Sequence, residues 1–132
     1  CKLALSIIAT NICRDHNVNF AWCRLFYLYG ENEDSRRFVP FLRNSLSQGI
    51  VAQLTDGTQI RDYMDVKDAG VRIAEIATGK QIGIINICSG QEITIREFAE
   101  KIADEYDRRD LLHFGKRKTN IIDPPYLVGV PN

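Results

Sequence analysis

The chain has 132 residues, enough for one domain with a sizeable core, and its apolar (45%) and charged (26%) fractions are ordinary for a globular protein. Seventeen basic and seventeen acidic residues cancel, so no overall field favours nucleic acid or an anionic membrane as a partner. We expect neither a membrane span, which takes about 20 apolar residues, nor a secretory leader.

The four cysteines (Cys1, Cys13, Cys23 and Cys88) show neither paired spacing nor the spacing of metal ligands. We therefore expect reduced, mostly buried thiols in a cytoplasmic protein, and no metal site. His16 and His113 lack a Cys or carboxylate arrangement typical of a triad, and we expect them at the surface or at a helix end.

The first half of the chain predicts two helices and a strand. Residues 3–13 are apolar on nearly every side and predict a helix that is covered on more than one face. Residues 18–29 are almost continuously apolar and aromatic, which is typical of a strand buried on both faces of a parallel sheet. Ser35 is a candidate cap for a helix over 36–48, which Gly49 would end.

Strands and helices alternate in the second half. We predict strands over 50–54, 60–64, 82–87 and 111–114, and helices from 65 or 66 to 78 and from 94 to 106. Thr94 and Glu97 have the spacing of a capping box. Residues 115–132 are basic and then broken by prolines, which predicts a loop. This alternation of elements predicts an α/β fold.

The tract from Asp56 to Asp68 is the most informative part of the chain. A glycine turn leads into an Arg-Asp-Tyr strand, and the strand leads into a helix with an acidic start. Arg61 and Asp62 point to opposite faces of the strand, so one can pair internally while the other faces a cleft. A guanidinium can bind two phosphate oxygens at once, which makes Arg61 a candidate ligand of a phosphate or diphosphate. The alternative is a surface ion pair.

This tract resembles the Gly-x-x-x-Arg-Asp-(Tyr/Trp)-x-x-Val-x-Asp block of the extended short-chain dehydrogenase/reductase family. Its members are NAD-dependent epimerases, dehydratases and reductases that modify nucleotide-sugars. The resemblance implies that Arg61 contacts the substrate diphosphate. It implies structural roles for Asp62, as a loop anchor, and for Asp68, as a charge at a helix start.

The segment from Arg24 to Gly30 resembles the Arg-x-x-Asn-x-Tyr-Gly strand end of the same family. The resemblance implies that Leu25 and Phe26 line a nicotinamide pocket. Tyr27 stands where the family has an Asn that contacts the sugar nucleotide, and a phenol can also donate a hydrogen bond. The alternative for Tyr27 is a core or interface aromatic.

Two further segments imply contacts to the substrate nucleotide. Arg37 and Phe38 stand at a helix start that resembles the one covering the nucleotide, and a helix N-terminus with an added arginine suits an anion. The alternative is that Arg36 and Arg37 are merely solvated. Ala52 and Leu54 lie in the strand whose backbone and apolar side chains hold the base in the family.

Lys2 is the catalytic candidate. Dehydrogenases of the family carry Tyr-x-x-x-Lys on one helix face, where the Lys holds the nicotinamide ribose and lowers the pKa of the Tyr. The Lys2-Leu3-Ala4-Leu5 segment resembles the run that follows this Lys. The resemblance therefore implies a catalytic and cofactor-binding role for Lys2, with its Tyr four positions earlier and outside the chain. The alternative is a solvent-exposed lysine.

The resemblance covers nearly the whole chain and implies the C-terminal part of a Rossmann-type enzyme, without the glycine-rich phosphate loop. It implies that residues 1–30 and 62–90 are a remnant of the dinucleotide-binding domain. Residues 31–61 and 91–132 would form the nucleotide-sugar binding lobe.

The intact protein would use NAD or NADP for hydride transfer at a sugar carbon, as an epimerase, dehydratase or 4-ketosugar reductase. We expect the fragment alone to be inactive and to bind no cofactor tightly. A homodimer through helix 3–13 is a further expectation. The alternative function is a non-catalytic module that binds a nucleotide or a protein.

Overall fold

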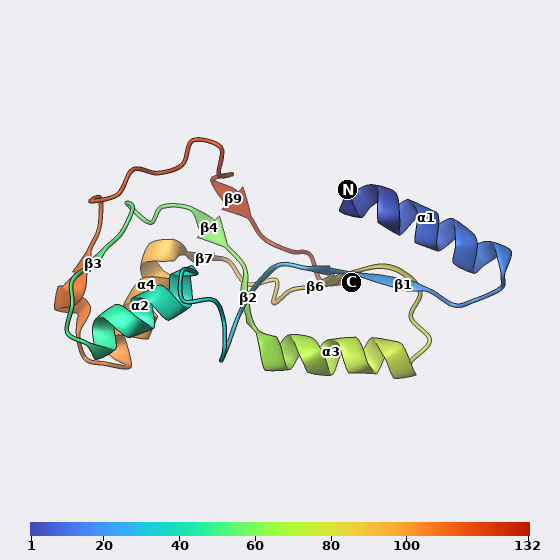
Figure 1. Ribbon diagram of the computed structural model, residues 1–132, viewed down its shortest axis with the longest axis horizontal. Coiled ribbons are helices and arrows are strands. Elements are labelled where there is room, and N and C mark those ends of the chain that lie inside the picture. The colour runs from blue at the N-terminus through green and yellow to red at the C-terminus, as the bar shows by residue number, and fades with distance from the viewer.

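The computed structural model describes residues 1–132 and shows an elongated α/β arrangement (Figure 1). The helices are α1 (Lys2–Asp15), α2 (Phe38–Ser47), α3 (Val66–Thr78) and α4 (Ile95–Asp104), with one 3₁₀ turn, η1 (Arg109–Leu111). The strands are β1 (Ala21–Leu25), β2 (Tyr27–Tyr29), β3 (Ala52–Gln53), β4 (Ile60–Arg61), β5 (Tyr63–Asp65), β6 (Gly83–Ile87), β7 (Ile93–Thr94), β8 (Leu112–His113) and β9 (Tyr126–Leu127). The predicted α/β class is confirmed.

The predicted strand over 18–29 is two strands in the structure. β1 pairs in parallel with β6, and β2 pairs in parallel with β5. The break falls at Phe26, whose backbone N–H still reaches the Ile87 carbonyl oxygen at 3.3 Å. The chain therefore changes its neighbouring strand at Phe26.

The prediction that this strand is buried on both faces is wrong. Leu25 is 54% exposed, and the other residues of β1 are at best half-buried. The reason is that α3 packs against β1, whereas a cavity of about 610 Å³ lies between β1 and α1.

The predicted helix over 3–13 is confirmed as α1, but it is not covered on more than one face. Ser6 is its buried residue, and its large apolar side chains are more than half exposed, namely Leu3, Leu5, Ile7, Ile8 and Ile12. All four cysteines are free, and none is buried, so the expectation of mostly buried thiols is wrong. His16 and His113 are exposed, as expected.

Local sequence signals explain where the other helices begin. Asp65 caps α3 by accepting a hydrogen bond from the Lys67 backbone N–H at 2.7 Å. Thr94 and Glu97 form the predicted capping box at the start of α4. The predicted cap at Ser35 is wrong, because α2 begins at Phe38 after the extended residue Arg37.

The buried apolar side chains form two separate cores. The first contains nine residues from α2, β3, α4 and the segments beside them: Val39, Leu42, Leu46, Ala52, Leu54, Ala99, Ile102, Ala103 and Leu111. The second joins α3 to β6 and contains Ala69, Ile76, Ile85 and Ile87. Figure 1 shows the elements that carry these two cores on opposite sides of β2, α2 and α4 on one side and α3 and β6 on the other.

A small mixed sheet lies beside the first core. β4 pairs antiparallel with β7 and parallel with β9. β9 lies inside the predicted loop of residues 115–132, and it exists because Ile60 and Arg61 stand opposite Tyr126 and Leu127. The C-terminus returns to β6, where the Asn132 side chain donates a hydrogen bond to the Ile84 carbonyl oxygen at 3.0 Å.

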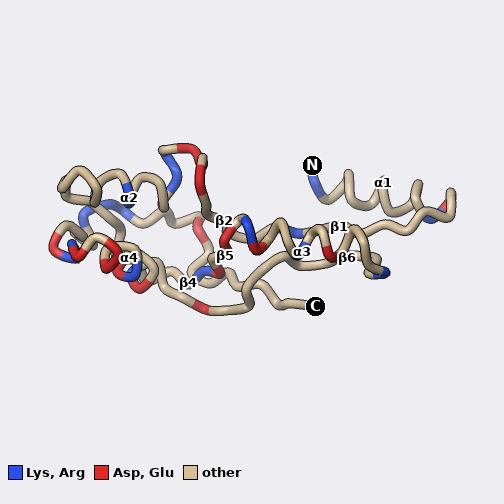
Figure 2. The backbone as a smooth tube through the Cα atoms, turned by 90° about the horizontal axis from the view of Figure 1, so that it is seen from below, with Lys and Arg blue, Asp and Glu red and all other residues tan.

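The longest helix has 14 residues, and none of the helices has the length and apolar content that crossing a membrane requires. No group of three His, Cys, Asp or Glu side chains is arranged to hold a metal ion. Charged residues lie along α3 and α4 and in the segment before α2, and on α1 they are confined to its two ends (Figure 2).

Candidate functional site

The turn before β4 is built by Gly57. This residue has φ of +68°, a backbone conformation that suits glycine. A Cβ at this position would lie 2.9 Å from the Arg96 backbone nitrogen. The Arg96 N–H also donates to the Gly57 carbonyl oxygen at 3.0 Å. The turn is therefore fixed against the start of α4, and it sets where the next residues point.

Arg61 is almost fully buried, with 2% of its surface exposed. Its Nη1 donates a hydrogen bond to the Ile60 carbonyl oxygen at 2.9 Å, and its Nη2 lies 4.0 Å from Asp123 Oδ2. The guanidinium carbon lies 5.5 Å from the centroid of the Tyr27 ring. Arg61 is thus neither in a surface ion pair nor open to a wide cleft, and its single carboxylate neighbour is distant.

An aromatic cluster that includes Tyr27 lies beside Arg61. The ring of Tyr63 stacks on Phe98 with centroids 4.0 Å apart, and Tyr27 and Phe38 lie at 5.8 and 6.4 Å from it. Burial raises the pKa of Tyr63 to about 12, although the nearby Arg61 charge acts in the opposite direction. Tyr63 therefore stays a neutral hydrogen-bond donor throughout the physiological pH range.

A cavity of about 790 Å³ lies between α2, the turn before β4 and the loop after β8. Phe38, Phe41 and Leu54 contribute apolar walls, and Gln59 contributes a buried amide. The cationic side chains at this cavity are Arg36, Arg117 and Lys118, and Asp123 links it to Arg61. Arg36 is bound by Asp34 at 2.6 Å, and that hydrogen bond holds the pKa of Asp34 below its ordinary value.

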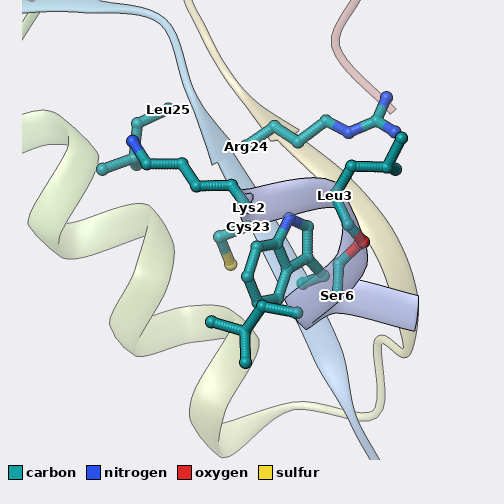
Figure 3. Close-up of a pocket in the computed structure, with 8 residues that line it drawn as sticks. Lys2, Leu3, Ser6, Cys23, Arg24 and Leu25 are labelled. Atoms are coloured by element: carbon teal, nitrogen blue, oxygen red, sulfur yellow. The ribbon is translucent and has the colours of Figure 1, made fainter. Parts of the chain in front are cut away.

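The cavity between α1 and β1 contains two of the predicted cofactor residues. Lys2 and Leu25 both line it, together with Trp22, Cys23 and Arg24. Figure 3 shows Lys2 extending toward Leu25, whereas Arg24 extends the opposite way. Of the two cations that line the cavity, Lys2 is therefore the one beside the apolar Leu25, and its cofactor role stays a prediction. The 132 residues contain no glycine-rich loop for the phosphates.

The structure brings the other predicted site residues together only in part. Tyr27, Phe38 and Arg61 meet in the aromatic cluster, and Leu54 lines the neighbouring cavity. Three do not join them. Phe26 packs beside Gly129, Arg37 pairs with Glu33 at 3.1 Å outside the cavity, and Ala52 is completely buried in the first core. The ligand roles of all these residues stay predictions.

Sequence reasoning missed Gln59, Tyr63 and Asp123. Gln59 stands two positions before Arg61, and side chains two apart along an extended segment share a face, so this alternation could have found it. Tyr63 could have been found in the same way. No sequence signal places Asp123 beside Arg61, because 61 residues separate them and an irregular loop forms the contact.

The chain is similar in sequence to a known protein family. The model of the NAD dependent epimerase/dehydratase family matches residues 1–88. Among curated relatives, dTDP-6-deoxy-L-talose 4-dehydrogenase (NAD(+)) of Aggregatibacter actinomycetemcomitans is 28% identical over 91 residues, which are 68% of this chain and 34% of that protein. The chain thus spans about a third of the length of this relative.

Solved structures show the same fold at low identity. A UDP-N-acetylglucosamine 4-epimerase of Methanobrevibacter ruminantium, in complex with UDP-N-acetylmuramic acid, matches with a TM-score of 0.89 and 19% identity, over 98% of this chain and 43% of that one. A UDP-glucose 4-epimerase of Thermus thermophilus, in complex with NAD, matches with a TM-score of 0.83 and 19% identity, over 97% and 43%. At these identities the likeness shows the fold alone, a partial Rossmann-type domain.

Proposed function

The chain belongs to the NAD dependent epimerase/dehydratase family, and we propose that it is the C-terminal, substrate-holding part of an NAD(P)-dependent enzyme that modifies a nucleotide-sugar. The reaction class is epimerisation, dehydration or 4-ketosugar reduction. Motifs in family order along nearly the whole chain support the C-terminal assignment. The assignment of residues 31–61 and 91–132 to the substrate lobe, and of 1–30 and 62–90 to the dinucleotide domain, belongs to the same proposal.

The observation that carries the proposal is the buried guanidinium of Arg61. Its one close acceptor is the Ile60 carbonyl, and its carboxylate neighbour Asp123 stands at 4.0 Å. A buried cation requires an anionic partner to offset the loss of hydration, and a diphosphate offers oxygens that match the fork of an arginine. The adjoining cavity adds Arg117 and Lys118, which favour the same ligand charge.

In the intact enzyme Lys2 would hold the ribose of the dinucleotide, with Leu25 and Phe26 against the nicotinamide. NAD or NADP, when bound, supplies the hydride acceptor or donor. The charge of Lys2 would lower the pKa of a tyrosine one helical turn before it, so that the phenolate can take a proton from the sugar hydroxyl. A homodimer through α1 is proposed because its apolar side chains are exposed.

The test of the substrate site is titration of the chain with UDP by calorimetry. We expect Arg61→Lys to weaken binding about tenfold or more, because Lys keeps the charge and loses the fork. Arg109→Lys is the matched control, since Arg109 is exposed and pairs with Asp104. Equal UDP affinity in Arg61→Lys and the unmodified chain would contradict the proposal.

The coding sequence upstream of Lys2 distinguishes the enzyme from the alternative function, a non-catalytic binding module. A tyrosine four residues before Lys2 and a glycine-rich loop further upstream would support the enzyme. Measured NAD(P) turnover by residues 1–132 alone would contradict the expectation that this part is inactive.

A further inference from the structure

Strand β6 has one strand neighbour, and its other edge pairs with no strand. It lies parallel to β1, where the Gly83 N–H donates to the Phe20 carbonyl oxygen at 2.8 Å. Backbone groups of successive residues in a strand face alternate edges, so those of Ile85 also face β1. The backbone groups of Ile84 and Asn86 therefore face the outer edge.

The side chain of Asn132 occupies this outer edge. Its Nδ2 donates to the Ile84 carbonyl oxygen at 3.0 Å, and its Oδ1 accepts from the Asn86 N–H at 2.9 Å. In a parallel ladder, one residue of the neighbouring strand bonds to the two residues that flank its partner in the same way. The carboxamide thus makes the hydrogen bonds of a strand residue placed beside Ile85.

Two further contacts hold the C-terminal segment against β6 (Figure 1). Asn86 Nδ2 donates to the Val130 carbonyl oxygen at 3.0 Å, and Arg72 of α3 donates to the Asn132 backbone oxygen at 3.4 Å. All four hydrogen bonds are exposed, so water can replace them when the segment detaches. The segment is therefore a cover that the chain can release.

Without Asn132, β6 would present an apolar edge. Its sequence, Gly-Ile-Ile-Asn-Ile, contains neither a charge nor a proline, the residues that commonly keep sheet edges apart. Ile84 is 50% exposed, and Ile82 just before the strand is 62% exposed. The same edge of a second copy is complementary, because antiparallel pairing of two identical edges uses the same backbone groups on both.

We propose that the Asn132 carboxamide takes the place of one strand residue and so blocks the edge of β6 from pairing with the β6 edge of a second copy. The contact is autoinhibitory, since the chain's own segment occupies the backbone groups that the second copy would use. None of these residues lines the substrate cavity, and the surface is not the one proposed for a dimer through α1.

Amide hydrogen exchange measured by NMR tests the contact itself. We expect the Asn86 amide to exchange about tenfold faster in Asn132→Ala than in the unmodified chain, because its acceptor is removed. The Ile85 amide, which faces β1, should be unaffected. Asn44→Ala is the matched control, since the Asn44 side chain is exposed on α2 and accepts from Gln48. Equal exchange of the Asn86 amide in Asn132→Ala and the unmodified chain would overturn the proposal.

Sedimentation tests the blocking role. Asn132→Ala should form dimers at a concentration about tenfold lower than the unmodified chain or Asn44→Ala. Adding Ile84→Lys places a charge on the edge and should remove this extra dimer. Faster exchange at Asn86 without more dimer, or an extra dimer that persists with Ile84→Lys, would overturn the proposal.

If Asn132→Ala does not fold, the unmodified chain decides. Its Asn86 amide must exchange as slowly as its Ile85 amide, and fast exchange at Asn86 alone would overturn the contact.

Discussion

Asp62 Oδ1 accepts two hydrogen bonds from Ser89, one from its backbone N–H at 2.9 Å and one from its hydroxyl at 2.7 Å. The other oxygen, Oδ2, accepts from the backbone N–H of Gly90 at 2.8 Å and of Gly129 at 3.3 Å. One fully buried carboxylate thus joins the residue after Arg61 to the loop after β6 and to the C-terminal segment. It fixes the backbone from which Arg61 extends.

Replacing Asp62 with Ala should lower the free energy of unfolding by about 3 kcal/mol. Three backbone donors and one hydroxyl would lose their charged acceptor in a buried place. Urea unfolding measures this change. Asp104→Ala is the control, because that carboxylate is exposed and pairs only with surface arginine, and its unfolding midpoint should hardly move. Equal midpoints for the two variants would contradict the anchoring role.

Two glycine substitutions should act in opposite directions. Gly57→Ala places a Cβ against the Arg96 backbone at a positive φ, so the free energy of unfolding should fall by roughly 1–3 kcal/mol. Gly70 lies inside α3, and a Cβ added to it would have nothing within 4 Å. Gly70→Ala should therefore raise the free energy of unfolding by about 1 kcal/mol. Chemical denaturation of both variants measures the difference, and a stabilised Gly57→Ala would show the turn conformation to be wrong.

The capping box should make stability depend on pH through Glu97. Hydrogen bonds from the Thr94 backbone and hydroxyl hold the pKa of Glu97 below its ordinary 4.5. A lowered pKa means that the stabilisation is complete above about pH 4.5 and is lost as the pH falls through the folded-state value. Glu97→Gln should therefore differ from the unmodified chain in thermal midpoint at pH 7, and the difference should shrink below pH 4. A difference that is constant with pH would exclude the carboxylate as its cause.

Tyr63 should control stability at alkaline pH. Its pKa is raised by burial from 10.0 to about 12. Between about pH 10 and 12 the folded state therefore keeps the phenol proton that the unfolded chain has lost. The free energy of unfolding is unaffected by this group below about pH 10 and declines between about pH 10 and 12. Tyr63→Phe keeps the stack on Phe98 and should flatten this decline. Urea midpoints from pH 8 to 12, with absorbance titration of the phenols, test the assignment. An unchanged decline in Tyr63→Phe would place its origin at another residue.

Local signals made part of the fold predictable. The caps at Asp65 and Thr94 and the stop at Gly49 are read from neighbouring residues, and the helices they bound were predicted within a few positions. The breaks between strands at Phe26 and Asp62 are not predictable from neighbouring residues, because each depends on which distant strand pairs with the segment. β9 was missed for the same reason, since two residues carry no periodicity.

The candidate site, too, could be predicted from the sequence only in part. The residue types of the tract around Arg61 point to an anion, and family resemblance narrowed that anion to a diphosphate. The burial of Arg61 accompanies contacts with the segment after β8, where Asp123 lies near Arg61 and β9 pairs with β4. These are tertiary contacts, and the spacing of residues along the chain does not predict them.

The position of Asp123 affects the free energy with which an anion could bind Arg61. Its carboxylate stands 4.0 Å from Arg61 Nη2 and at the border of the cavity. Although it makes no hydrogen bond to the guanidinium, it is an anion tethered near it, and the loop sets its local concentration whatever the buffer contains. If a phosphate binds Arg61 as proposed, it competes with this tethered carboxylate for the guanidinium. The affinity that a titration reports would then be the intrinsic affinity multiplied by the fraction of molecules in which Asp123 does not contact Arg61.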